Sequence, residues 1–427
     1  MLRIKRGVAH ELCQFVAMHV PTIIARKREG EELSSKEISK IIQAYAADEL
    51  PDYQMAALAM AIYFRGMNSR EIADLTRAMM DSGERFEHRD GHPPVVDKHS
   101  TGGIGDKVSL ILAPLVACAG CWVPMVSGRG LGITGGTLDK LESIPRFQVR
   151  IPLDQASAQL EKIGVVMMGQ TEKFCPADRK LYSLRDVTGT VPSIALITAS
   201  IMSKKLAESL DRLVLDVKYG SGAFMKNLEQ ATALAASMSE VGKAMGVEIH
   251  TSLNAMDEPL GRAVGNALEV AESIDCLNGG GPEDLRKIVL DLSEMITTTP
   301  RVQLEKWLDD GTAREKFDQI VIAQNGNPDD LNRLLEIHRA PIIRDVIAGH
   351  GGTVQRADAG MIGQASLQLG CGRAKASDEV DFAVGFDQLV KCGESIHAGQ
   401  AVCRIHARSA VDFEMAEALI ERAVVIG

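Results

Sequence analysis

Two glycine-rich segments that lie close together in the chain carry residue types that bind phosphate. The first reads DKHSTGGIGDKVS, residues 97–109, and the second reads SGRGLGITGGTLDKLES, residues 127–143. Glycines let successive backbone N–H groups converge on one point, and a phosphate dianion accepts several charge-assisted hydrogen bonds at once. The side chains that add donors are Lys98, Ser100, Ser109, Ser127 and Thr137. The sequence therefore predicts a site for free phosphate or a small phosphorylated sugar.

Nucleotide-binding patterns fit these segments less well. Neither segment is a Walker A loop, because Gly-Lys-Ser/Thr does not follow at the required spacing. Residues 130–135 match G-x-G-x-x-G, and Asp154 follows at roughly the distance of a ribose-binding carboxylate. However, Asp154 is expected to begin a helix rather than to end a second strand. A dinucleotide is therefore the weaker interpretation.

A second group of residues could act on a leaving group. His99 stands between Lys98 and Ser100, which makes it a candidate acid or hydrogen-bond donor, although a lone histidine is more often structural. Ser200 and Lys204 are four residues apart and hence share one helical face. Lys204 follows a long uncharged stretch and could equally be a solvated charge.

Charged residues in the second glycine-rich segment are expected to hold its shape. Asp139, Lys140 and Glu142 are predicted to lock the loop through ion pairs rather than to perform catalysis. Arg129 fits either a structural role in the loop or a contact to the anion.

Composition limits the class of protein. The chain has 427 residues, 45% hydrophobic and 24% charged, as in ordinary soluble enzymes, and its net charge of −10 argues against a nucleic-acid-binding surface. The eight cysteines are scattered, which is typical of buried thiols in a reducing compartment. Residues 108–128 are uncharged but contain two prolines, so a buried helix followed by a buried strand is favoured over a membrane span. A cytoplasmic location is expected, since no cleaved signal is recognisable.

The periodicity changes along the chain. Residues 1–80 look helical, with a helix start at Ser34–Glu37, and an α/β alternation begins near Val95. Helices are expected over 153–163, 193–209, 229–244 and 413–425, and strands over 95–97, 165–169, 213–218, 248–253 and about 380–385. This alternation predicts a mostly parallel sheet with its ligand at the carboxyl ends of the strands.

At this level of detail the chain resembles the thymidine and pyrimidine-nucleoside phosphorylase family. The motifs DKHSTGG, SGRGLGITGGTLDKLESIP, the run 182–205 and DVKYGSGAF carry the resemblance, which extends over essentially the whole chain. It implies an α/β protein with a helical domain (1–80 and 175–206), a large, mostly parallel α/β domain (81–174 and 207–344) and a C-terminal α+β domain (345–427). It also implies a homodimer, an active site between domains whose closure excludes water, and no cofactor besides phosphate as co-substrate.

The resemblance assigns roles to individual residues. It implies phosphate binding by the five donors named above, and a catalytic set that contacts the pyrimidine: His99, Arg185, Ser200 and Lys204. Residues that match the wall of the base or sugar pocket are Leu131, Tyr182, Val191, Ile197 and Phe224. Met125 matches a position where relatives that accept uridine have a lysine, so a preference for thymidine and deoxyuridine is expected.

Several positions depart from the family pattern. Ile133 stands where many relatives have histidine, and Gly189 and Pro192 replace alanine and aspartate near Val191. In certain relatives a potassium ion lies near the positions that match Gly105, residue 107, Leu260, Ala263 and Glu272. Here that second position is Lys107, whose ammonium could replace the ion, so no metal is assigned.

The reaction implied is the reversible phosphorolysis of thymidine or deoxyuridine to the free base and 2-deoxy-α-D-ribose 1-phosphate. A broader pyrimidine-nucleoside phosphorylase that also accepts uridine is the alternative. Two other classes remain open: a phosphoribosyltransferase, which would need magnesium and acidic ligands, and a non-catalytic phosphate or nucleobase sensor. The presence of His99, Arg185 and Lys204 argues against the sensor.

Overall fold

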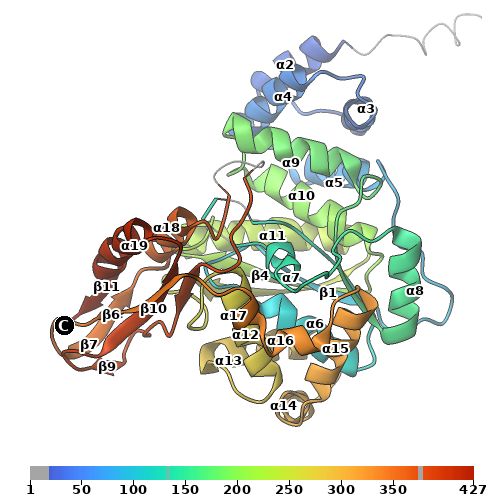
Figure 1. Cartoon of the computed structure of the whole chain (residues 1–427). Coiled ribbons are helices and arrows are strands. Elements are labelled where there is room, and N and C mark those ends of the chain that lie inside the picture. The colour runs from blue at the N-terminus through green and yellow to red at the C-terminus, as the bar shows by residue number, and fades with distance from the viewer. Residues whose placement is uncertain (1–18, 131, 134, 374–377) are drawn as a thin grey trace, which may run out of the picture. The chain divides into compact units, whose positions relative to one another are not determined.

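The computed structural model describes residues 19–130, 132–133, 135–373 and 378–427. The chain divides into two compact units, which are described separately (Figure 1). Unit 1 contains the residues up to Gly83 together with Pro176–Ser203, and unit 2 contains Glu84–Cys175 and Lys204–Gly427.

Unit 1 is entirely helical in its described part. Its helices are α2 (Val20–Arg28), α3 (Ser35–Ala46), α4 (Asp52–Arg65), α5 (Ser69–Met80), α9 (Pro176–Thr188) and the first ten residues of α10 (Ile194–Ala207). The predicted helix start at Ser34 is confirmed. Ser34 and Glu37 form a capping box at the start of α3, and Asn68 and Glu71 form another at α5.

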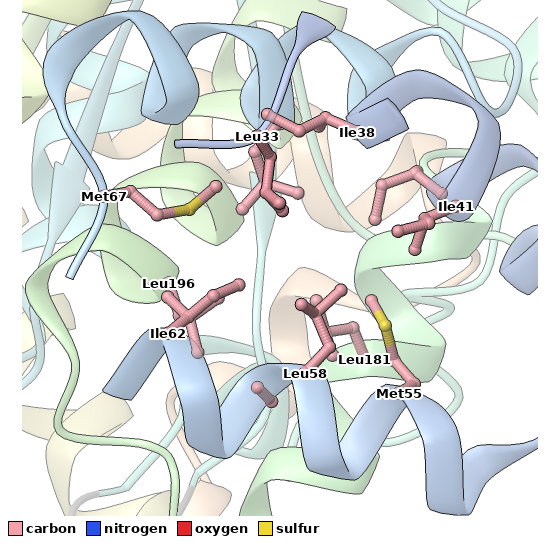
Figure 2. A pocket seen from close by; sticks show the side chains of 12 residues that line it. Leu33, Ile38, Ile41, Met55, Leu58, Ile62, Met67, Leu181 and Leu196 are labelled. Carbon is pink, nitrogen blue, oxygen red and sulfur yellow. The ribbon is translucent and has the colours of Figure 1, made fainter. Parts of the chain in front are cut away.

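The core of unit 1 is apolar. Ile38, Ile41 and Ile42 lie on one face of α3 at helical spacing, and they meet Met55, Leu58 and Ile62 of α4 around a small internal space (Figure 2). This cavity has a volume of about 20 Å³, close to what one water requires. It is therefore a packing defect and not a pocket for a nucleobase.

Unit 2 is built on parallel strands. The strands β1 (Val96–Ser100), β4 (Arg212–Tyr219) and β5 (Glu248–Ala255) pair in the order β1-β4-β5, and β2 (Val123–Ser127) pairs with β3 (Val165–Gly169). A parallel bridge between Val95 and Trp122 joins the two sets just before β1 and β2. The predicted parallel sheet is confirmed, and the carboxyl ends of β1 and β2 lie at one edge of it.

Helices pack around these strands. They are α6 (Val108–Cys118), α7 (Thr137–Glu142), α8 (Leu153–Ile163), α11 (Leu228–Ala244), α12 (Asn266–Leu277), α13 (Glu283–Ile296), α14 (Arg301–Asp309), α15 (Thr312–Ala323), α16 (Pro328–Leu331) and α17 (Leu334–Ile337). Helix α6 is buried almost all round and contacts α12, α13 and α15. This burial explains the uncharged run that follows Lys107. In the part of the chain that the structure describes, no helix could span a membrane.

The C-terminal part of unit 2 is α+β. Its strands are β6 (Ile342–Ile347), β7 (Gly352–Ala357), β8 (Gly385–Asp387), β9 (Ser395–Ile396), β10 (Ala401–Ala407) and β11 (Val424–Ile426), with helices α18 (Ala359–Leu369) and α19 (Ala410–Ala423). The strands form two antiparallel sheets, β6-β10-β8 and β11-β7-β9. Figure 1 shows α18 and α19 side by side against these strands, and all share one apolar core.

Two local expectations from the sequence are wrong. Helix α19 ends at Ala423, because Val424–Ile426 pair with β7 as β11. The alternating residues 380–385 are mostly irregular, since pairing with β10 begins only at Gly385. Pro114 lies inside α6, and the predicted buried helix followed by a buried strand is confirmed by α6 and β2. The apolar burial around α6 offsets the hydrogen bond that proline cannot make.

Candidate active site

Lys98 lies at the centre of a buried polar cluster at the carboxyl end of β1. It is 2% exposed, and its ammonium lies 3.4 Å from Ser109 Oγ, 3.8 Å from Asp106 Oδ1 and 3.7 Å from Asp216 Oδ2. These separations are longer than those of a tight ion pair. The structure therefore brings two of the predicted phosphate-binding residues together and holds the ammonium loosely.

The loop after β1 connects Ser100 to the same cluster. Ser100 Oγ donates to Asp106 Oδ2 at 2.5 Å and accepts from Gly102 N at 3.1 Å. Burial would raise the pKa of Asp106, but Lys98, Lys218 and the hydrogen bond from Ser100 hold that pKa well below its ordinary value. Asp106 is therefore ionised, and its charge offsets that of Lys98 at neutral pH.

Lys218 and Asp216 complete the cluster and were not predicted. Lys218 is fully buried, and its Nζ lies 2.9 Å from Asp216 Oδ2. The other carboxylate oxygen of Asp216, Oδ1, accepts from Asn254 Nδ2 at 2.7 Å. Two ammonium groups thus face two carboxylates in one place. The sequence signal was present, because DVK breaks the apolar run of β4, and a charge in a buried strand requires a partner.

The second glycine-rich segment is locked by the charges of Asp139 and Glu142, as predicted, whereas Lys140 pairs with Glu269 of α12 at 3.4 Å, outside the segment. Arg129 donates to Asp139 and Glu142, at 3.1 and 2.5 Å, and Asp139 also accepts from Gly130 N and from Arg373. Arg129 therefore has the structural role in the loop. A side chain at Gly136 would overlap the backbone of Arg129 and Gly130, so this crossing requires glycine.

The two predicted phosphate-binding residues of this segment, Ser127 and Thr137, lie at the two ends of its loop. Ser127 is the last residue of β2, and Thr137 is the first residue of α7, where backbone N–H groups point outward. Ile133 packs against the apolar core of the C-terminal part, so an apolar contact anchors the loop at this position. Leu131 lies outside the described residues.

His99 is half-buried and electrostatically close to three lysines. Burial, followed by the charges of Lys205, Lys204 and Lys98, holds the pKa of His99 well below its ordinary value. The imidazole is therefore neutral at physiological pH. Of the two predicted roles, hydrogen bonding fits this environment, and proton donation by an imidazolium does not.

Arg185 does not present its guanidinium to a ligand in this structure. It is 1% exposed and donates to three backbone carbonyls, of Thr190 (3.3 Å), Val191 (2.6 Å) and Leu196 (3.0 Å). Burial lowers the pKa of Arg185 to about 10, so it remains charged at neutral pH. Arg185 therefore shapes the turn between α9 and α10, in which Gly189 adopts a left-handed φ of 68°.

The remaining predicted residues differ in their exposure. In unit 1, Ser200 is buried, Val191 and Ile197 are half-buried, and Tyr182 is 38% exposed with its pKa raised to about 12 by burial. In unit 2, Lys204 is half-buried and Phe224 is 37% exposed in the turn after β4.

Met125 is placed in the core. It is fully buried in the hydrophobic cluster of unit 2, together with Val123 on the same face of β2. The expectation that its thioether lines a sugar pocket is therefore not met in this structure, because β2 is buried on both faces from Val123 to Val126.

Lys107 occupies the place suggested by the sequence. Its buried ammonium donates to Leu260 O (3.0 Å), Ala263 O (2.9 Å) and Glu272 Oε2 (2.5 Å). Burial would lower the pKa of Lys107, but the charge of Glu272 raises it, so the ammonium is retained. These residues do not fit a separate potassium ion. Among the described residues, no group of three or more His, Cys, Asp or Glu side chains could hold a metal ion.

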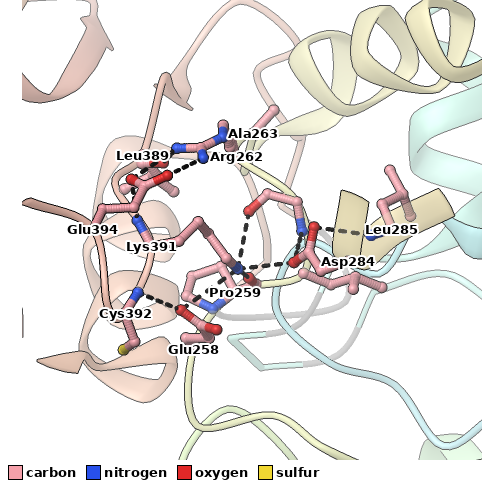
Figure 3. A network of polar contacts seen from close by, with 12 residues as sticks. Glu258, Pro259, Arg262, Ala263, Asp284, Leu285, Leu389, Lys391, Cys392 and Glu394 are labelled. Carbon is pink, nitrogen blue, oxygen red and sulfur yellow. Dashed lines mark hydrogen bonds and ion pairs between the residues drawn. The ribbon is translucent and has the colours of Figure 1, made fainter. Parts of the chain in front are cut away.

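The segment 258–263 is also held from the C-terminal part (Figure 3). Lys391 donates to Pro259 O at 2.5 Å and pairs with Asp284 at 2.9 Å, while Arg262 forms an ion pair with Glu394. Lys107 at the start of α6 and Lys391 thus fix this segment from two sides.

Replacing Lys107 by methionine is expected to lower the melting temperature. Glu272 would remain as a largely buried carboxylate without its ammonium, and breaking a buried pair in this way costs about 3–5 kcal/mol. The double variant Lys107→Met/Glu272→Gln should recover part of the loss. As a control, Lys287→Ala removes an exposed pair with Asp291 and should change little. An unchanged melting temperature in Lys107→Met would contradict the assigned role.

Family models match three successive parts of the chain. Residues 21–83 match the helical bundle domain of a glycosyl transferase family, residues 92–314 its a/b domain, and residues 353–427 the C-terminal domain of pyrimidine nucleoside phosphorylases. A solved anthranilate phosphoribosyltransferase (TrpD) from Thermus thermophilus superposes with a TM-score of 0.58 at 20% identity, covering 71% of this chain and 99% of that one. It shares the fold. The class is therefore that of the glycosyl transferases with a helical bundle and an a/b domain.

Curated relatives narrow this class. Two proteins named pyrimidine-nucleoside phosphorylase, from Geobacillus stearothermophilus and Bacillus subtilis (strain 168), are each 44% identical to this chain. The alignments cover 92% and 91% of this chain and 94% and 92% of the relatives. The chain belongs to the pyrimidine-nucleoside phosphorylase family.

Proposed function

We propose that this protein catalyses the reversible phosphorolysis of pyrimidine nucleosides, with thymidine and deoxyuridine as preferred substrates. The observation that carries the proposal is the buried cluster around Lys98, whose loosely held ammonium and neighbouring hydroxyls suit a phosphate dianion. The identity to relatives that are named for this reaction supports the same conclusion.

In the proposed reaction, a phosphate oxygen forms a bond to the sugar C1′ while the bond from C1′ to the base nitrogen breaks. The electron pair leaves with the base, which then takes up a proton. Positive charge develops on the sugar, and bound phosphate stabilises it. Negative charge develops on the base, and Lys204 and the neutral His99 are proposed to stabilise it as preorganised donors.

Unit 1 is proposed to contribute to binding of the pyrimidine. Ser200 supplies a hydroxyl on α10, and Tyr182, Val191 and Ile197 supply apolar surface. Arg185 is proposed to act indirectly, because its guanidinium fixes the backbone around Val191. A homodimer located in the cytoplasm, needing phosphate but no resident cofactor, completes the proposal.

Thymine release from thymidine, measured with and without phosphate, tests this function. Release that requires phosphate is expected. Base release that depends on pyrophosphate and magnesium would favour the phosphoribosyltransferase class. Binding without turnover would favour a sensor.

Deoxyuridine is expected to exceed uridine in kcat/KM by up to about 10²-fold, since an apolar site rejects an added hydroxyl only to that extent. The support is the family resemblance alone, in which Met125 stands where relatives that accept uridine have a lysine, because the side chain of Met125 is itself buried in the core of unit 2. The two substrates share one base, so the ratio isolates the hydroxyl. Equal values would indicate the broader pyrimidine-nucleoside phosphorylase.

A further inference from the structure

A buried lysine at the end of α10 joins three elements of unit 2. Lys205 is 1% exposed, and its ammonium donates to Asp97 of β1, to Val126 O of β2 at 2.9 Å, and to Glu208 Oε1 at 2.7 Å. Val126 N in turn donates to Glu208 Oε1 at 3.0 Å. These four residues are called the Lys205 cluster.

Three of the four members of the cluster adjoin a residue of the proposed site. Asp97 precedes Lys98, Val126 precedes Ser127, and Lys205 follows Lys204. Adjacent residues in a strand point to opposite faces, so Asp97 holds β1 from one side while Lys98 faces the polar cluster of Asp106, Asp216 and Lys218 on the other. A shift of the cluster would therefore move three proposed ligands together.

The Lys205 cluster would carry a net negative charge if both of its carboxyl groups were ionised. One ammonium would then face Asp97 and Glu208, both fully buried. Among the described residues, Asp97 Oδ1 and Glu208 Oε2 have no hydrogen-bond donor. A proton on Glu208 supplies that donor and balances the charge. Burial and the neighbouring Asp97 both raise the pKa of Glu208 well above its ordinary value, in agreement with this arrangement.

We propose that Lys205 is a positioning residue for the reaction, and that it acts through Asp97 and a protonated Glu208 to hold the ends of β1, β2 and α10 in register. The inference rests on the proposed function. A positioning role differs from a purely structural one, because loss of Lys205 is then expected to lower phosphate affinity and turnover as well as the melting temperature.

The chain offers a matched buried pair away from this cluster. Lys27 of α2, 3% exposed, donates to both oxygens of Glu71, 1% exposed, at 2.9 and 3.1 Å within unit 1. Neither residue is in the proposed site. Neutralising this pair therefore controls for the general cost of losing a buried lysine and its carboxylate.

The experiment compares Glu208→Gln, Lys205→Met/Asp97→Asn and Lys27→Met/Glu71→Gln with the wild type. The readouts are melting temperature, phosphate affinity by calorimetry, and kcat and KM with thymidine. Glu208→Gln should stay within about threefold of the wild type, because a neutral amide can donate to Asp97 and accept from Lys205. The Lys205→Met/Asp97→Asn variant, which leaves no uncompensated charge, should lose about 10² in kcat/KM, as expected for ligands displaced by about 1 Å. It should also bind phosphate more weakly.

The control double variant should lose stability but retain the phosphate affinity and turnover of the wild type. Equal activity in Lys205→Met/Asp97→Asn and the control would overturn the positioning role. A loss in Glu208→Gln as large as that in the Lys205 variant would overturn the protonated Glu208. If the wild type releases no thymine, the proposed function fails, and calorimetry with inorganic phosphate still tests the positioning role.

Discussion

Lys204→Ala is expected to lower kcat for thymidine phosphorolysis by about 10²–10³, the usual loss when one preorganised donor to a developing negative charge is removed. Lys204 is half-buried at the end of α10, and its charge helps to keep His99 neutral. Because the side chain is half-buried and not fully buried, Lys204→Ala is expected to lower turnover far more than stability. Steady-state kinetics together with the melting temperature check both statements.

A lysine outside the proposed site serves as the control for Lys204→Ala. Lys243 is exposed in the last turn of α11, and Lys243→Ala should leave kcat unchanged. Near-normal turnover in Lys204→Ala would remove this residue from the mechanism.

Phosphate affinity is expected to depend on Lys98 and Ser127, which come from different glycine-rich segments. Loss of a hydrogen bond to a charged group costs about 1.5–3 kcal/mol, or roughly 10–10² in the dissociation constant. Ser127→Ala should show this loss with little change in stability, because Ser127 is half-buried at a strand end. Lys98→Ala should lose affinity and also stability, since Asp106 and Asp216 would share only Lys218.

Calorimetric titration of the variants with inorganic phosphate measures this directly. Thr232→Ala, which removes an exposed hydroxyl on α11, is the control. If phosphate raises the melting temperature of Ser127→Ala and Lys98→Ala as much as that of the wild type, these two residues do not share an anion.

The sequence predicted the architecture well because its signals were local and strong. The buried strand at residues 213–218, the helix at 153–163 and the capping box at Ser34 were all read from periodicity and capping. The misassigned end of α19 shows the limit. Val424–Ile426 continue an apolar helical pattern, and only their pairing with the distant β7 makes them a strand.

The site was less predictable because its geometry is set by tertiary contacts. Arg185 carries a charge that the family resemblance assigned to the base, yet three carbonyls accept its hydrogen bonds. Arg185→Ala is therefore expected to lower stability as well as activity, since three carbonyl acceptors would lose their donor at about 1–3 kcal/mol each. Likewise, no local pattern shows on which face of β2 Met125 falls.

Partners distant in sequence were also beyond prediction. Asp97 and Lys205 are 108 residues apart, and Lys27 and Glu71 are 44 residues apart. Each of these charges looks like an ordinary polar residue in the sequence. Only the fold shows that they are buried and paired.

The most direct test of the proposed function is nuclear magnetic resonance of the products formed from thymidine and phosphate by the purified protein. The proposed phosphorolysis predicts thymine and 2-deoxy-α-D-ribose 1-phosphate in equal amounts, with inversion at C1′, and no reaction when phosphate is omitted. Free deoxyribose, a β-configured sugar phosphate, or the absence of any product from pyrimidine nucleosides would contradict it.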